Sequence, residues 1–263
     1  MRFTKMHGLG NDYLYVYGEV PENIRELSIK LSERHFGAGS DGMIYISPSD
    51  AADFKMRIFN ADGSEAKMCG NGIRCVGKYV YDKGYTDKKN LRIETLSGIR
   101  TLELNVSNGK VKSVSVDMGK SETGEDMHLV IDGEEVLCTP VSVGNPHAVV
   151  FVPDINIAPL TTLGPKLEHH VIFPEGVNNE FVQVIDECTL RMRVWERGSG
   201  VTMACGTGAC ASVAAAIKHK FCCFDDDISV ILDGGTLKIK ISPDYSVTMT
   251  GPAEIIYEGE YEE

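Results

Sequence analysis

The sequence MRIFNADGS at residues 56–64, followed by MCGNG at residues 68–72, has a counterpart in the second half of the chain. That counterpart is MRVWERGSG at residues 192–200, followed by ACGTG at residues 204–208. The spacing is constant, because 192 − 56 and 205 − 69 both equal 136. Met, Arg, aliphatic, aromatic, Cys and Gly positions match without a gap, so the chain contains an internal duplication.

A second pair of segments extends the repeat toward the N-terminus. LGNDYLYV at residues 9–16 matches VGNPHAVV at residues 143–150, with an offset of 145 − 11 = 134. Gly-Asn alone marks a turn almost anywhere, but here its order and spacing agree with the longer repeat. Each half therefore carries a Gly-Asn turn leading into a strand, then a second strand, then Cys-Gly-x-Gly.

The hydrophobic pattern predicts an α+β fold made of two pseudo-symmetric halves. Alternating segments predict strands at residues 57–59, 91–94, 111–116, 191–195 and 237–241. Helical spacing predicts one helix from Pro21 to just before Gly37, one after Cys69 through about Tyr81, and one after Cys205 through about Lys218. Strands dominate, and the boundary between the halves is expected near Met118.

Composition excludes several classes of protein. The 263 residues are 43% hydrophobic and 24% charged, which is typical of a folded globular protein. The formal net charge of −12 and the lack of a basic patch argue against nucleic-acid and anionic-membrane partners. The N-terminus has no apolar signal region, and no apolar run approaches the roughly 18–20 residues of a membrane span. We therefore expect a cytoplasmic protein.

The chain has eight cysteines, and none of them forms a Cys-x-x-Cys pair. The spacings give weak support to a zinc or iron–sulfur site, and disulfides are not expected without a secretion signal. Small buried side chains are the default interpretation for Cys138 and Cys188, while Cys222 and Cys223 stay unassigned. The cysteines are Cys69, Cys75, Cys138, Cys188, Cys205, Cys210, Cys222 and Cys223.

Cys69 and Cys205 differ from the others because they occupy the same place in each half. Each precedes two glycines and a helix-compatible segment, which puts its thiol at a helix N-terminus. Unpaired N–H groups and the helix dipole stabilise negative charge there, so they can lower a thiol pKa and hold a carboxylate. The P-loop alternative fails, because the required Lys-Ser/Thr is missing.

Two such thiols suit the inversion of a stereocentre next to a carboxylate. One thiolate removes a proton from one face of the carbon, and one thiol returns a proton to the other face. Helix N-termini would stabilise the carboxylate as charge builds on it. The alternative is that both cysteines are buried remnants of an old duplication.

The motifs resemble the diaminopimelate epimerase family over essentially the whole chain. This resemblance implies an isomerase that needs no pyridoxal phosphate or other cofactor and no metal. The implied reaction converts LL- to meso-diaminopimelate in lysine and cell-wall precursor biosynthesis. The segments that carry the resemblance are KMHGLGND (5–12), FNADGS (59–64), CGNGIRC (69–75), GNPH (144–147), ERG (196–198) and ACGTGACA (204–211).

The resemblance also implies a fold and an assembly. Each half is expected to be a mostly antiparallel sheet or barrel wrapped around a helix. The expected halves are residues 1–117, completed by the tail 252–263, and residues 118–251. A cytoplasmic homodimer acting on a small-molecule substrate is expected as well.

The resemblance assigns roles residue by residue. Cys69 and Cys205 match the catalytic cysteines, whereas Cys75 and Cys210 are expected to pack inside. The backbone at Gly70, Asn71, Gly206 and Thr207 would hold the reacting carboxylate. Arg197 suits a distal carboxylate and Glu196 suits an ammonium, while His147 would support the reacting centre. The expected distal set is Asn11, Asn60, Asn145, Asn178, Glu196 and Arg197.

Two segments depart from the family pattern. Gly42 stands where many members have Gln, so any contact from that glutamine side chain is absent. Residues 176–181, GVNNEF, differ from the common Val-Asn-Val but keep Asn178. The open alternatives are a racemase of the same fold acting on proline, hydroxyproline or histidine, and a non-catalytic thiol redox protein.

Overall fold

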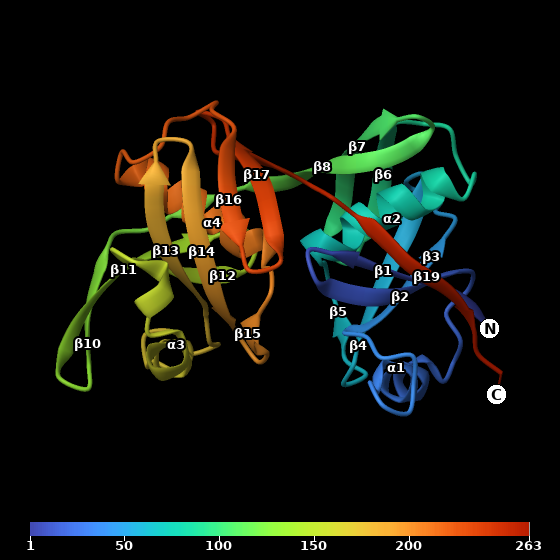
Figure 1. Cartoon of the computed structure of the whole chain (residues 1–263), viewed down its shortest axis with the longest axis horizontal. Helices are drawn as coiled ribbons and strands as arrows, with labels where there is room; N and C mark the ends of the chain where they lie inside the picture. The colour runs from blue at the N-terminus through green and yellow to red at the C-terminus, as the bar shows by residue number, and fades with distance from the viewer. Residues whose placement is uncertain (263) are drawn as a thin grey trace. The chain divides into compact units, whose positions relative to one another are not determined.

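The chain divides into two units by its internal contacts. Unit 1 is Met1–Val116 together with the C-terminal segment from Gly251 onward, and unit 2 is Asp117–Thr250. The computed structural model describes residues 1–262 (Figure 1). Within that range no helix has the length and apolar character needed to cross a bilayer.

Unit 1 is a mostly antiparallel sheet with two parallel pairings. β1–β2, β3–β4, β6–β7 and β7–β8 are antiparallel, whereas β2–β3 and β4–β6 are parallel. β19 pairs with β1 and closes this unit with the last strand of the chain. The elements are β1 (Arg2–Gly8), β2 (Asn11–Tyr17), α1 (Ile24–Ser32), β3 (Gly42–Ser47), β4 (Phe54–Asn60), β5 (Glu65–Ala66), α2 (Gly70–Asp82), β6 (Asn90–Thr95), β7 (Gly98–Ser107), β8 (Lys110–Lys120), which runs past the unit boundary, and β19 (Glu254–Glu260).

Unit 2 repeats the same order of connections. β11–β12, β13–β14, β16–β17 and β17–β18 are antiparallel, whereas β12–β13 and β14–β16 are parallel. The α+β fold expected from the internal repeat is confirmed. The elements are β9 (Glu122–Thr123), β10 (Met127–Ile131), β11 (Glu134–Ser142), β12 (Pro146–Phe151), the 3-10 turn η1 (Ile155–Ile157), α3 (Leu160–Glu168), β13 (Asn178–Asp186), β14 (Thr189–Glu196), β15 (Gly200–Thr202), α4 (Gly206–Lys218), β16 (Ile228–Leu232), β17 (Gly235–Ile241) and β18 (Ser246–Gly251).

A buried helix follows the second strand pair of each unit. α2 contacts β1, β2 and β7, and every residue from Gly70 to Val80 is buried. α4 contacts strands from β9 to β17, and its small side chains let those strands approach closely. Both helices lie amid the strands of their own unit in Figure 1. Each unit thus wraps its sheet around the helix that begins with Cys-Gly-x-Gly.

The helix boundaries agree with the sequence in two places and differ in two. α2 and α4 end within one residue of the expected ends. α1 is shorter than expected and ends at Ser32, because residues 33–41 turn back toward β3. No helix is expected from the sequence at α3, which contains Pro165, a residue that normally interrupts helices. Gly164 is required there, since a Cβ atom would lie 2.7 Å from the Trp195 side chain.

Glu168 at the end of α3 fixes the turn between β14 and β15. Its Oε2 accepts from Trp195 Nε1 at 2.7 Å, and its Oε1 accepts from the Gly198 backbone N–H at 2.8 Å. Burial opposes ionisation of this carboxyl group, but these two bonds, with His169 and Arg197 nearby, hold its pKa below the ordinary value. One carboxylate therefore joins α3 to the end of β14 and to the turn that follows it.

Glu168→Gln should destabilise unit 2. The Gln NH2 would face an N–H donor, so one bond is lost, at a cost of about 1–3 kcal/mol. Because the folded pKa is lowered, this stabilisation is present above the ordinary value of 4.5 and fades as the pH falls through the folded pKa. Trp195 is the only tryptophan in the chain, so its fluorescence reports urea unfolding of this unit.

The exposed Glu134→Gln variant is the matched control and should leave the unfolding free energy unchanged. A Glu168→Gln protein as stable as the parent at pH 7 would contradict the buttressing role of this carboxylate.

Candidate active site

Cys69 caps the N-terminus of α2 in unit 1. Its Sγ accepts from the Gly72 backbone N–H at 3.3 Å and lies 3.4 Å from Asn11 Oδ1, to which the thiol donates. Gly70 and Asn71 form the first turn of the same helix, where backbone N–H groups point toward the N-terminal end. An anion at this point would meet the positive end of the helix.

Asp41 ties the polar residues of unit 1 together. Asn11 Nδ2 donates to Asp41 Oδ2 at 2.8 Å, and the Ala61 backbone N–H donates to the Asp41 carbonyl at 2.9 Å. Burial raises the pKa of the Asp41 carboxyl group, although the Asp12 backbone N–H donates to it and partly opposes this shift. The bond from Ala61 holds the end of β4, where Asn60 lies, beside Asp41.

Gly42 occupies a position that no larger residue can fill. A Cβ atom would lie 2.2 Å from the Phe59 carbonyl oxygen and 2.9 Å from Tyr13 Cε1. The Tyr13 hydroxyl instead donates to Asn60 Oδ1 at 3.4 Å. A tyrosine on β2 thus contacts Asn60 in a chain that has no glutamine at position 42.

Cys205 caps the N-terminus of α4 in the same way. Its Sγ accepts from the Gly208 backbone N–H at 3.4 Å and lies 3.6 Å from Thr207 Oγ1. Asn145 Nδ2 donates to Thr207 Oγ1 at 3.3 Å, which places Asn145 beside the thiol turn. Gly206 and Thr207 form the first turn of α4.

The pKa of Cys205 differs in direction from the sequence expectation. Burial, followed by the charges of Glu196 and Glu180, raises this pKa well above the ordinary thiol value. The helix N-terminus favours the thiolate, but here desolvation and two carboxylates outweigh it. Cys205 is therefore a thiol at neutral pH in unit 2 without substrate.

Glu196 and Arg197 lie at the turn after β14, close to Cys205. Glu196 accepts a hydrogen bond from the Thr202 hydroxyl, and burial raises the pKa of its carboxyl group. The Arg197 backbone N–H donates to Asn178 Oδ1 at 2.9 Å, and its guanidinium donates to the Glu175 carbonyl at 2.9 Å. In unit 2, Glu196 thus lies beside the Cys205 thiol, and Arg197 and Asn178 meet at the same turn. Asn11 and Asn60, the other members of the expected distal set apart from Asn145, belong to unit 1.

His147 is fully buried between two oxygen acceptors. Its Nδ1 lies 2.8 Å from Glu180 Oε1 and its Nε2 lies 3.1 Å from Asn145 Oδ1. Sequence reasoning named His147 and Asn145 but missed Glu180, Tyr13 and Thr202. The available signal for Glu180 was a charged residue directly before the mostly apolar segment FVQV at residues 181–184.

The remaining cysteines separate by burial. Cys75 and Cys210 are buried inside their helices, as expected, and so is Cys138. Cys188 was expected to be buried but is exposed, because it lies in the tight turn between β13 and β14. Cys222 is buried and Cys223 is exposed. Within residues 1–262, no three His, Cys, Asp or Glu side chains converge as metal ligands would.

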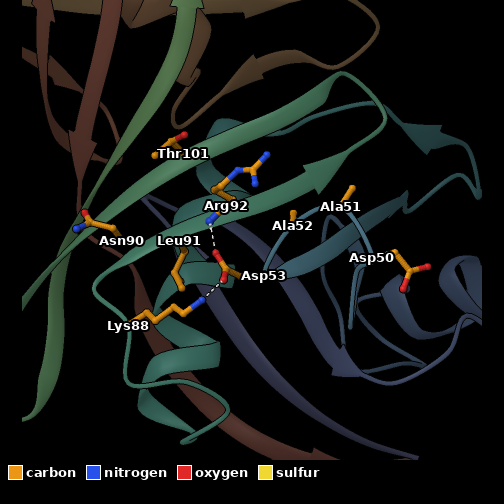
Figure 2. Close-up of a pocket in the computed structure, with 9 residues that line it drawn as sticks. All are labelled: Asp50, Ala51, Ala52, Asp53, Lys88, Asn90, Leu91, Arg92 and Thr101. Atoms are coloured by element: carbon orange, nitrogen blue, oxygen red, sulfur yellow. Dashed lines mark hydrogen bonds and ion pairs between the residues drawn. The ribbon is translucent and has the colours of Figure 1, made fainter.

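A surface pocket of about 630 Å³ in unit 1 is separate from this chemistry. Figure 2 shows Lys88 paired with Asp53, whose carboxylate also accepts from the Arg92 backbone N–H. None of the residues that line this pocket is one of the expected site residues. Its lining is Asp50, Ala51, Ala52, Asp53, Lys88, Asn90, Leu91, Arg92 and Thr101.

Solved structures resemble the whole chain at low sequence identity. A Bacillus anthracis protein of the PhzF phenazine-biosynthesis family aligns with a TM-score of 0.82 at 16% identity, covering 100% of this chain and 99% of that one. A probable proline racemase from Agrobacterium radiobacter aligns with a TM-score of 0.75 at 17% identity, covering 99% and 92%. These likenesses show the fold alone.

Sequence comparisons identify the family. The model described as "Diaminopimelate epimerase" matches residues 3–123 and 139–256. The chain is 53% identical to the diaminopimelate epimerase of Acetivibrio thermocellus, covering 99% of this chain and 98% of that protein. It is 49% identical to that of Bacillus subtilis, with the same coverage. The chain therefore belongs to the diaminopimelate epimerase family.

Proposed function

We propose that this isomerase converts LL-diaminopimelate to meso-diaminopimelate with two thiols, Cys69 and Cys205, and without a cofactor. Membership of the family supports the assignment of this reaction, which is part of lysine and cell-wall precursor biosynthesis. The observation that carries the mechanism is the repeated N-cap: each unit presents one thiol above the first turn of a buried helix. No other cysteine pair in the chain occupies equivalent positions in the two repeats.

The proposed step inverts one carbon. One sulfur, as thiolate, takes the proton from the α-carbon, and the C–H electron pair delocalises into the adjacent carboxylate. The other sulfur, as thiol, gives its proton to the opposite face of the same carbon. Each turnover therefore leaves the two sulfurs with exchanged protonation states, so the reverse reaction uses them in the opposite roles.

The helix N-termini would stabilise the charge that develops in this step. Backbone N–H groups at Gly70, Asn71, Gly206 and Thr207 would point toward the reacting carboxylate, whose negative charge increases as the proton leaves. A fixed N–H group needs no reorganisation at that moment. Such stabilisation would let a thiolate remove a weakly acidic proton without the electron sink that a cofactor would supply.

The second amino-acid head group distinguishes diaminopimelate from smaller substrates. Arg197 would pair with its carboxylate and Glu196 would accept from its ammonium, with Asn11, Asn60, Asn145 and Asn178 as further polar contacts. His147 would support the reacting centre from beside Asn145. Proline, hydroxyproline or histidine would leave Arg197 and Glu196 without a joint partner.

The resemblance also supports a cytoplasmic homodimer whose two homologous halves, residues 1–117 with 252–263 and residues 118–251, cooperate in binding substrate. Sedimentation of the purified chain at micromolar concentration tests the dimer.

The reduced protein should incorporate deuterium at the α-carbon of LL-diaminopimelate in D2O and form the meso isomer without added cofactor. The physical reason is that a thiol equilibrated with D2O delivers deuterium to the inverted face. Mass spectrometry and chiral chromatography measure both products. L-Proline, trans-4-hydroxy-L-proline and L-histidine serve as comparison substrates, and turnover of one of these in place of diaminopimelate would overturn the assignment.

Cys69→Ser and Cys205→Ser should each reduce turnover by at least about 10³-fold, because a serine hydroxyl is a far poorer base and acid at neutral pH. Cys222→Ser, which removes a buried thiol outside the repeat, is the control and should retain parental activity. Meso-diaminopimelate formation gives the rate for each variant. Equal activity in all three variants would refute the two-thiol mechanism, and loss in only one of the first two would refute the exchange of roles.

A further inference from the structure

The two units differ in one residue directly beneath the thiol turn. A Cβ atom added to Gly72 in unit 1 would lie 2.7 Å from Ile44 Cδ1. A Cβ atom added to Gly208 in unit 2 would lie 2.6 Å from Glu180 Oε1. Both pairs follow the repeat, because 208 − 72 and 180 − 44 equal 136. The same structural position therefore holds an aliphatic side chain in one unit and a carboxylate in the other.

Glu180 is an unusual residue for this position. Its side chain and that of His147 are both 0% exposed, and they meet at 2.8 Å. Glu180 Oε2 has no hydrogen-bond partner among the described residues. A buried carboxylate with an unsatisfied oxygen is unfavourable for folding, and Ile44 shows that an apolar side chain fits this site in the repeat. A structural role alone therefore does not explain Glu180.

The histidine beside Glu180 is also absent from unit 1. Parallel pairing of β12 with β13 places His147 and Glu180 on the same face, toward α4. At the offset of 134 found for this strand, the equivalent of His147 is Tyr13. Unit 1 thus has Tyr13 and Ile44 where unit 2 has an imidazole and a carboxylate in contact.

We propose that Glu180 is a positioning residue that orients His147 against Asn145 and, together with Glu196, holds negative charge beside the thiol turn of Cys205, so that this thiol stays protonated until substrate binds. Glu180 places a negative charge next to the Cys205 turn, and that charge disfavours a second negative charge on sulfur. The same carboxylate accepts from His147 Nδ1 and fixes the ring against Asn145. The proposal rests on the two-thiol mechanism above.

Few other charged groups reach the thiol within unit 2. Glu196 from β14 and Glu180 from β13 face Cys205, with His147 from β12 behind Glu180. The buried thiol of Cys210 lies deeper in α4 itself. Glu122 on β9, Glu134 and Glu135 on β11, and Lys238 and Lys240 on β17 are exposed, and β16 carries no ionisable side chain.

The test measures the reactivity of Cys205 against pH in the full-length protein without substrate. Iodoacetamide modification of the peptide that contains Cys205 is followed by mass spectrometry in the parent, Glu180→Gln and Glu180→Ile. Removing the negative charge of Glu180 should lower the pH midpoint of Cys205 alkylation by about one pH unit in both variants. Below the midpoint, this shift makes alkylation about tenfold faster at a fixed pH.

The two variants separate charge from orientation. Glu180→Gln keeps an oxygen acceptor for His147, so it should retain more of the parental kcat than Glu180→Ile, with KM for LL-diaminopimelate changed less than kcat. Glu135→Gln is the matched control, because Glu135 also pairs with a histidine, His128, but on the exposed surface. It should leave the alkylation midpoint and kcat unchanged.

Unchanged alkylation midpoints in both Glu180 variants would overturn the proposal, even if their thermal stability differs from that of the parent. A midpoint shift of the same size in Glu135→Gln would overturn it as well. Alkylation does not require turnover, so a parent protein that fails to epimerise diaminopimelate refutes the proposed function and leaves the measurement on Cys205 interpretable.

Discussion

The hydrogen bond from a glycine N–H to a cysteine sulfur at the start of a buried helix is the constraint on which the rest depends. The Gly72 backbone N–H donates to Cys69 Sγ, and the Gly208 backbone N–H donates to Cys205 Sγ. A sulfur atom is only a weak hydrogen-bond acceptor for a helix N–H group. The turn therefore also needs residues small enough for the sulfur and the helix backbone to come close to each other. A Cβ atom at either glycine would lie under 3 Å from a side chain of the strand beneath, Ile44 or Glu180, which would have to shift. The helix, the thiol and the neighbouring strands are consequently fixed together.

The duplication supplies one scaffold with two different chemical environments. In unit 1 the thiol turn lies against Asn11, Tyr15 and Ile44, whereas in unit 2 it lies against Glu180, Glu196 and Thr207. Backbone connections are nearly identical, so the difference lies in side chains on equivalent strands. Equivalent backbones thus place the two thiols in the same local geometry, while unequal side chains give them different surroundings.

The fold could be predicted from sequence because the repeat is long and gapless. The order of strands and the two Cys-Gly-x-Gly helices follow from residues 56–72 and 192–208. α3 could not be predicted, because the contact that stabilises it comes from Trp195 and Glu168, which are far apart in sequence. In the site, the cysteines stand out by symmetry. Glu180 does not, because the sequence shows a charge next to an apolar segment but not that this charge lies beneath Gly208, toward a thiol. The direction of the Cys205 pKa has the same origin, since burial is a property of the folded chain.

The pairing of β19 with β1 affects the order in which the protein can fold during synthesis. Residues 2–7 pair with residues 254–260, so the outer edge of β1 has no partner until residues 254–260 have left the ribosome. Residues 117–250 contain every strand of unit 2 apart from the last residue of β18, so this later unit can complete its core first. The earlier unit meanwhile exposes a strand edge, which is a template for pairing with other chains. A nascent chain that stalls before residue 254 would thus carry a finished second unit and an aggregation-prone first one.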